Sequence, residues 1–151
     1  MIEEFRIHSQ EPSSNISCEE NTRRLSLKSP QDHLFYKVRV DKGLDCTQET
    51  KCDFLIIKES DDSIWLYVEL KGKDLEKAFK QMEVTHNRYK NTTNTNKKFY
   101  GAIVASRVKP AVKTIQQRFT AKMKDKYNMK FFVKCQSLEL KYNKDLNSIE
   151  Q

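Results

Sequence analysis

The chain has 151 residues, 37% hydrophobic and 32% charged, which suits one domain with a modest core beneath a highly charged surface. Its formal net charge of +7 suits a polyanionic partner such as nucleic acid, while only three glycines and three prolines argue against a low-complexity or linker-rich protein. The four cysteines lack the spacing of a zinc site and no apolar run could span a membrane, so we expect a soluble cytoplasmic protein with reduced thiols.

The first third of the chain predicts strands that follow an irregular start. Residues 1–21 show no sustained hydrophobic period and are expected to be irregular. Residues 23–28 alternate polar and apolar side chains, and residues 35–41 alternate again after a turn-forming stretch. We interpret these two runs as a hairpin, whose second strand leads through a glycine-containing turn into a further strand at residues 52–58.

A second hairpin follows, in which the polar residues 58–62 form the turn and residues 64–72 form the returning strand. Successive side chains of a strand point to opposite faces, so Trp65, Tyr67 and Glu69 share a face with Lys71. Charges appear only at the end of this strand. This otherwise apolar strand face can therefore extend beyond the core at its charged end.

The second half of the chain alternates helices and strands. The predicted elements are a helix at 73–89, a polar loop at 91–98, a strand at 99–105, a helix beginning at Pro110, a strand at 129–135 and a fraying tail at 142–151. A strand that follows a crossover helix runs parallel to the strand before it. The sequence thus predicts one α/β domain, residues 1–151, with a mixed central sheet: an antiparallel meander, a crossover helix to a parallel strand, and flanking helices.

Three charged residues lie where the second hairpin brings strand ends together. Asp53 begins one strand, and Glu69 and Lys71 end the next. Two carboxylates held close repel each other unless a cation lies between them, and hard oxygen ligands suit Mg²⁺ or Mn²⁺. A lysine beside the metal can orient a water or stabilise charge on a phosphate. The alternative is a solvated pair at a strand end.

These residues resemble the core of the PD-(D/E)XK nuclease superfamily, which includes many restriction endonucleases and RecB-like nucleases. Asp53 and the Glu69-x-Lys71 string carry the resemblance, with an amphipathic helix immediately afterwards. It implies a restriction-endonuclease-like fold and a metal-dependent nuclease, an enzyme that hydrolyses phosphodiester bonds. In that role Asp53, Glu69 and the backbone carbonyl of Leu70 would hold Mg²⁺ or Mn²⁺, and Lys71 would act on the attacking water or the developing charge.

The following helix carries a further part of the resemblance. Gln81 lies where the RecB-like branch has a glutamine, and would position a water, the lysine or the substrate; a surface glutamine is the alternative. Two positions depart from the pattern. Cys52 stands where the name of the superfamily has proline, and Thr85 stands where a tyrosine usually follows the glutamine.

The resemblance also implies a nucleic-acid partner, and by family precedent DNA rather than RNA. Candidate phosphate contacts are Lys37, Arg39, Lys73 and Lys77. Many family members have an upstream acid at the metal, a part that Glu19 or Glu20 could take. The alternative function is a non-catalytic nucleic-acid-binding or adaptor domain that retains the fold. By analogy, the protein could act as a homodimer or as a subunit of a larger defence or repair system.

Overall fold

The computed structural model describes residues 3–45, 51–72, 74–91, 96–106 and 112–151, with the backbone alone at Lys71, Gly72 and Val112. It is a mixed α/β fold, as predicted. Its elements are α1 (Glu3–Ile7), β1 (Asn15–Glu20), β2 (Arg23–Lys28), β3 (Phe35–Arg39), β4 (Phe54–Lys58), β5 (Ile64–Gly72), α2 (Leu75–Tyr89), β6 (Lys98–Ala105), α3 (Val112–Tyr127), β7 (Met129–Cys135), β8 (Ser137–Asn143) and β9 (Ser148–Glu150). No helix in the described ranges is both long and apolar enough to cross a membrane.

The central sheet has five strands in the order β3-β4-β5-β6-β7. Strands β3, β4 and β5 pair antiparallel, whereas β5, β6 and β7 pair parallel. Helix α2 connects β5 to β6, and α3 precedes β7. The predicted meander, crossover helix and parallel strand are therefore confirmed. The predicted start of the second helix at Pro110 lies outside the described residues.

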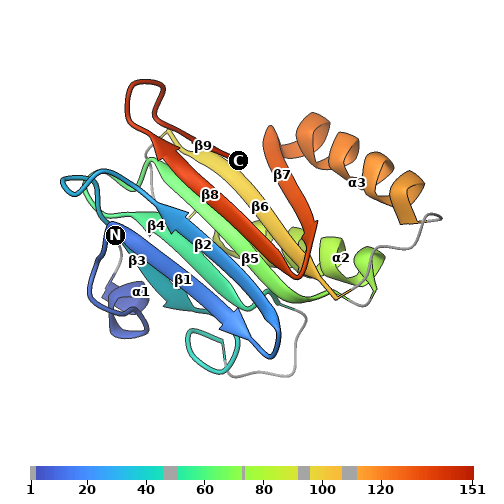
Figure 1. The fold of residues 1–151 in the computed structure, drawn as a ribbon, viewed down its shortest axis with the longest axis horizontal. Coiled ribbons are helices and arrows are strands. Elements are labelled where there is room, and N and C mark those ends of the chain that lie inside the picture. The colour runs from blue at the N-terminus through green and yellow to red at the C-terminus, as the bar shows by residue number, and fades with distance from the viewer. Residues whose placement is uncertain (1–2, 46–50, 73, 92–95, 107–111) are drawn as a thin grey trace.

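A second sheet, in the order β1-β2-β8-β9, lies across one face of the central sheet, and α2 and α3 lie on the other side (Figure 1). This sheet corrects two predictions. The segment 1–21 contains α1 and β1 and is not irregular, because Phe5, Ile16 and Cys18 are buried. The segment 142–151 is not a fraying tail, because Tyr142 and Ile149 enter the core from paired strands.

The hairpin predicted from residues 23–28 and 35–41 is wrong. Strand β2 pairs antiparallel with β1 and parallel with β8, while β3 belongs to the central sheet. The connection between them crosses from one sheet to the other, and the Ser29 Oγ, which has one proton to donate, lies within hydrogen-bond distance of the backbone carbonyls of both Ser14 and His33. Local alternation identified both strands correctly but carries no information about their partners.

Strand β5 is buried on both faces and separates the two halves of the core. Leu66 and Val68 face the second sheet, in a cluster that contains Leu25 and Leu27. Trp65 faces the helices, together with Tyr67 and the apolar stripe of α2. The alternation predicted for this strand is confirmed, and α2 begins at Leu75 after an N-cap in which the Asp74 side chain accepts from the N–H of Lys77 at 3.1 Å.

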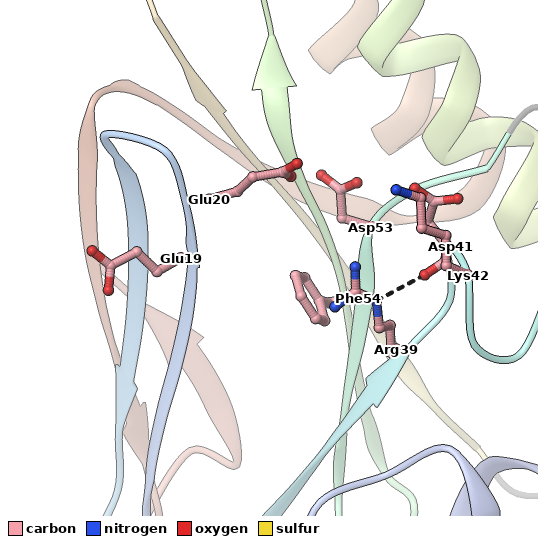
Figure 2. A pocket seen from close by; sticks show the side chains of 7 residues that line it. All are labelled: Glu19, Glu20, Arg39, Asp41, Lys42, Asp53 and Phe54. Atoms are coloured by element: carbon pink, nitrogen blue, oxygen red, sulfur yellow. Dashed lines mark hydrogen bonds between the residues drawn. The ribbon is translucent and has the colours of Figure 1, made fainter.

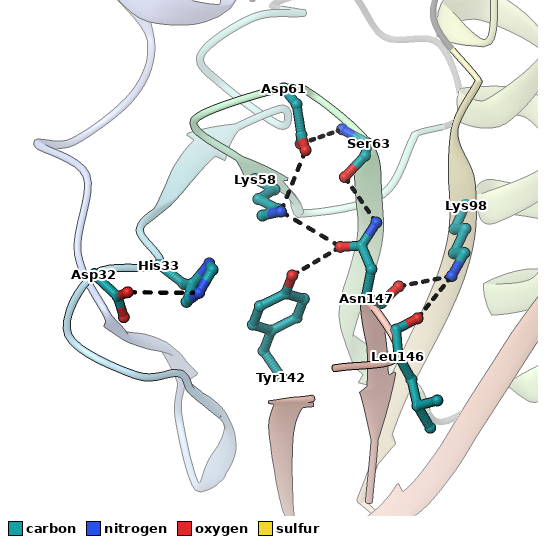
Figure 3. Close-up of polar contacts among 9 residues, drawn as sticks. All are labelled: Asp32, His33, Lys58, Asp61, Ser63, Lys98, Tyr142, Leu146 and Asn147. Carbon is teal, nitrogen blue, oxygen red and sulfur yellow. Dashed lines mark hydrogen bonds and ion pairs between the residues drawn. The ribbon is translucent and has the colours of Figure 1, made fainter. Parts of the chain in front are cut away.

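Polar contacts fix the C-terminal hairpin of β8 and β9 to the turn between β4 and β5 (Figure 3). The Oδ1 atom of Asn147 accepts from Lys58 Nζ at 3.4 Å and from Tyr142 Oη at 2.8 Å. Its Nδ2 atom donates to Ser63 Oγ at 3.3 Å, and Lys98 Nζ donates to the Asn147 carbonyl at 2.8 Å. The second sheet is therefore attached to the central sheet at the end opposite Asp53.

Candidate metal and nucleic-acid site

Asp53 lies directly before β4, at the end of the sheet where β5 finishes. The ladder pairs Phe54 with Val68, and the N–H of Asp53 also donates to the Val68 carbonyl at 3.0 Å. Two residues of one strand thus face one residue of the other, which is a β-bulge, a device that re-aims a side chain. The Asp53 side chain turns along the sheet, and its Oδ2 accepts from the N–H of Leu70 at 2.8 Å.

Glu69 and Lys71 flank the residue that Asp53 contacts. Glu69 is 1% exposed, and strand alternation places it on the face of Trp65 and Tyr67. The backbone of Lys71 continues β5, but its side chain lies outside the described part of the structure. The hairpin therefore brings the Asp53 side chain to the backbone of Leu70, between Glu69 and Lys71, while the predicted sharing of one cation by the Asp53 and Glu69 carboxylates stays a prediction.

The negative charges of Glu69 and Asp53 both affect the pKa of the Cys52 thiol. Its pKa is raised well above the ordinary value, first by complete burial, then by the negative charge of Glu69 and, to a smaller extent, by that of Asp53. A single buried thiol thus lies within electrostatic range of both acids. Cys52 is therefore a buried core residue rather than a reactive thiolate.

Helix α2 fixes the chain immediately before Asp53. The Gln81 side chain donates from Nε2 to the Lys51 carbonyl at 3.2 Å, and Thr85 Oγ1 accepts from the N–H of Cys52 at 2.9 Å. The same Thr85 hydroxyl donates to the Gln81 carbonyl at 2.8 Å. Gln81 is therefore placed beside the segment that leads into Asp53, and Thr85, which the sequence marked only as a departure from the pattern, holds that segment with it.

A small pocket of about 100 Å³ opens beside Asp53. It is lined by Glu19, Glu20, Arg39, Asp41, Lys42, Asp53 and Phe54. Figure 2 shows the carboxylates of Glu20 and Asp53 directed toward each other, with Glu19 turned away and Asp41 and Lys42 on the other side of Asp53. Of the two upstream acids considered from the sequence, Glu20 is the one that extends toward Asp53.

The four predicted phosphate contacts have different positions. Arg39 lines the pocket, and Lys37 lies near it, with its Nζ donating to the Ser17 carbonyl at 2.8 Å. Lys77 is exposed on the first turn of α2 and is not part of the pocket wall. Lys73 lies outside the described residues. Asp41, Lys42 and Phe54 line the pocket but carried no signal in the sequence that distinguished them from ordinary strand and turn residues.

The donor set fits a hard divalent cation. The Oδ2 atom of Asp53 accepts from the Leu70 N–H. Asp53 also lines the pocket, where the Glu20 carboxylate is directed toward it. Within the ranges that the structure describes, no three His, Cys, Asp or Glu side chains form a group that could hold a metal ion. Mg²⁺ usually binds one or two carboxylates and keeps several waters, so the carboxylates of Asp53 and Glu20 suit it.

No family model, curated protein or solved structure matches this chain.

Proposed function

We propose that this chain is a metal-dependent nuclease that hydrolyses phosphodiester bonds, with DNA as the substrate. The observation that carries the proposal is the hydrogen bond from the Leu70 N–H to the Asp53 carboxylate, which is 2.8 Å long. This bond joins an acid at the start of β4 to the segment of β5 that supplies a second acid and a lysine. The order of the central sheet, with a meander and a crossover helix, also supports it.

In this proposal some residues bind the metal ion, and others act on the attacking water or fix the chain beside it. As the sequence predicts, Asp53, Glu69 and the Leu70 carbonyl would hold Mg²⁺ or Mn²⁺, which would supply an activated water and offset charge on the phosphate. Glu69 does not line the pocket beside Asp53, and Glu20, which extends toward Asp53 there, would be a further ligand. Lys71 orients the attacking water or stabilises the developing negative charge. Gln81 fixes the Lys51 carbonyl and so holds the approach to Asp53 in one conformation.

Charge supports a nucleic-acid substrate, and the preference for DNA comes from the resemblance alone. The chain carries a formal net charge of +7, and basic surfaces attract the phosphate backbone without regard to sequence. Arg39 lines the pocket and Lys37 lies beside it, and in this proposal both contact phosphate.

Two measurements test the proposal. Plasmid, linear and single-stranded DNA, and RNA, are incubated with the protein and Mg²⁺ or Mn²⁺, and metal affinity is measured by calorimetry without nucleic acid. The wild type is compared with Asp53→Asn, Glu69→Gln and Lys71→Ala. Asp145→Asn, which changes an exposed aspartate in the loop between β8 and β9, is the matched control.

We expect the two carboxylate variants to lose both metal binding and cleavage, and Lys71→Ala to lose cleavage while it still binds metal. Removing the metal with EDTA stops cleavage by the wild type. Salt-sensitive binding of nucleic acid without any cleavage would instead identify a non-catalytic binding domain. Cleavage that persists unchanged in Lys71→Ala would reject the role given to that lysine.

A further inference from the structure

An aromatic ring lies directly beside Asp53. Phe54 follows Asp53 in the chain, faces Arg39 across the ladder, and is only partly buried at the margin of the core. The Lys37 Nζ lies 5.4 Å from the centroid of the ring, and the Arg39 Cζ lies 5.8 Å from it. Figure 2 shows the ring between Arg39 and the strand that carries Glu19 and Glu20. The pocket thus combines a π-face, cations and carboxylates.

The size of the pocket limits what can enter it. Its volume is about 100 Å³, which is room for one small flat ring and not for a stacked base pair. Base–aromatic stacking is stronger than a cation–π contact at an exposed site, so a base can replace the exposed Arg39 side chain over the Phe54 ring. Once displaced, the guanidinium has a phosphate of the same strand within reach.

We infer that this pocket receives one unpaired nucleotide, with its base stacked on Phe54 and its phosphate contacted by Lys37 and Arg39. The substrate class is then single-stranded nucleic acid, or the frayed end of a duplex, rather than an intact duplex. The inference rests on the proposed function, because it assigns a substrate to the same site.

The test measures binding without catalysis. Fluorescence anisotropy is recorded for a short labelled oligodeoxythymidine, an oligouridine of the same length and a blunt hairpin duplex, with Ca²⁺ in place of Mg²⁺. Phe54→Leu removes the π-face and keeps an apolar side chain at the margin of the core, while Phe54→Trp keeps the π-face. Tyr36→Leu, which removes another partly buried aromatic ring of the same sheet away from the pocket, is the control. Thermal melting of each variant verifies that it is folded.

The wild type should prefer the single strands, and Phe54→Leu should bind them roughly 5- to 100-fold more weakly, with unchanged duplex affinity. Phe54→Trp and Tyr36→Leu should bind like the wild type. Equal affinity of the wild type for single strand and duplex, or wild-type binding by a folded Phe54→Leu, would overturn the inference. Phe54-dependent binding in a protein that cleaves nothing would support the stacking pocket and reject the nuclease.

Discussion

The Asp53 carboxylate accepts a hydrogen bond from the backbone N–H of Leu70, and both groups are buried. The Asp53 carboxylate has two roles. It accepts a hydrogen bond from a main-chain N–H at the end of β5, and it lines the pocket. One oxygen is committed to structure. The stability of this end of the sheet and the chemistry of the pocket therefore depend on the same side chain.

The first prediction separates these two tasks. Asp53→Ala leaves the Leu70 N–H buried without an acceptor and should lower the free energy of unfolding by about 1–3 kcal/mol. Asp53→Asn keeps an oxygen for the same N–H and should unfold within about 1 kcal/mol of the wild type. Urea titrations of the two variants provide the measurement. Equal midpoints for Ala and Asn would show that the hydrogen bond does not stabilise the fold.

The second prediction concerns pH and His86. Its Nδ1 lies 3.0 Å from Tyr67 Oη, and its ring lies 4.5 Å from that of Phe99. Burial, helped by the charges of Lys90 and Lys97, lowers the pKa of His86 to about 4. In the unfolded chain this histidine takes up a proton below about pH 6.5, whereas the folded chain resists until about pH 4.

Stability should therefore fall as the pH is lowered from 6.5 to about 4, by about 1–3 kcal/mol, and this contribution should level off below that range. His86→Gln retains a polar group near Tyr67 but does not titrate. Denaturant titrations across this range should give a flatter pH profile for His86→Gln than for the wild type. Parallel profiles for the two proteins would contradict the prediction.

The third prediction concerns the close packing of β6 against β7. Gly101 pairs with Phe131, and a Cβ atom at Gly101 would overlap the Phe131 ring. Gly101→Ala should lower the free energy of unfolding by about 1–3 kcal/mol, since a packed core resists an added methyl group. The double variant Gly101→Ala/Phe131→Leu gives the methyl group room. It should be less destabilised than the sum of the two single variants, and simple additivity would argue against the overlap.

The fourth prediction tests how the C-terminal hairpin is attached. Asn147 has a positive φ of 46° and contacts Lys58, Ser63 and Tyr142 through its amide. Asn147→Gly suits this backbone but removes all three contacts, and should cost about 1–3 kcal/mol. Asn147→Asp keeps the oxygen acceptor and should cost less. Hydrogen exchange of β9 amides should accelerate more in the glycine variant than in the aspartate variant.

The parts of the fold that sequence alone predicted are those with long, uninterrupted periods. Strand β5 alternates Trp65 and Tyr67 with Leu66 and Val68, and α2 buries a stripe that includes Phe79. Each of these patterns has enough apolar positions to distinguish a period of two from one of 3.6. The antiparallel and parallel neighbours of β5 then follow from a tight turn on one side and a crossover helix on the other.

The missed strands are those with few apolar side chains or with distant partners. Strand β1 buries only Ile16 and Cys18, which is too short a pattern to identify in a polar segment. Strand β8 has apolar side chains at every second position, Leu138, Leu140 and Tyr142, so a search for a period of two would have found it. Its pairing with β2, by contrast, is a long-range contact that no local pattern encodes.

The candidate site was predictable only as far as residue type and strand position allow. The approach of Asp53 to the end of β5 follows from the hairpin between them. The contact of Gln81 with a main-chain carbonyl has no signature in the sequence, because any polar side chain at that helix position could make it. The exposure of Phe54 depends on how the second sheet ends, and that sheet was not predicted.

The parallel pairing of β2 with β8 brings Arg24 beside Ser137, from opposite ends of the chain. During synthesis on the ribosome, the edge of β2 that pairs with β8 stays without its partner strand until residues 137–141 have emerged. Nascent chains stalled before residue 137 should bind chaperones through this unpaired strand edge, and chains stalled after β8 has emerged should not.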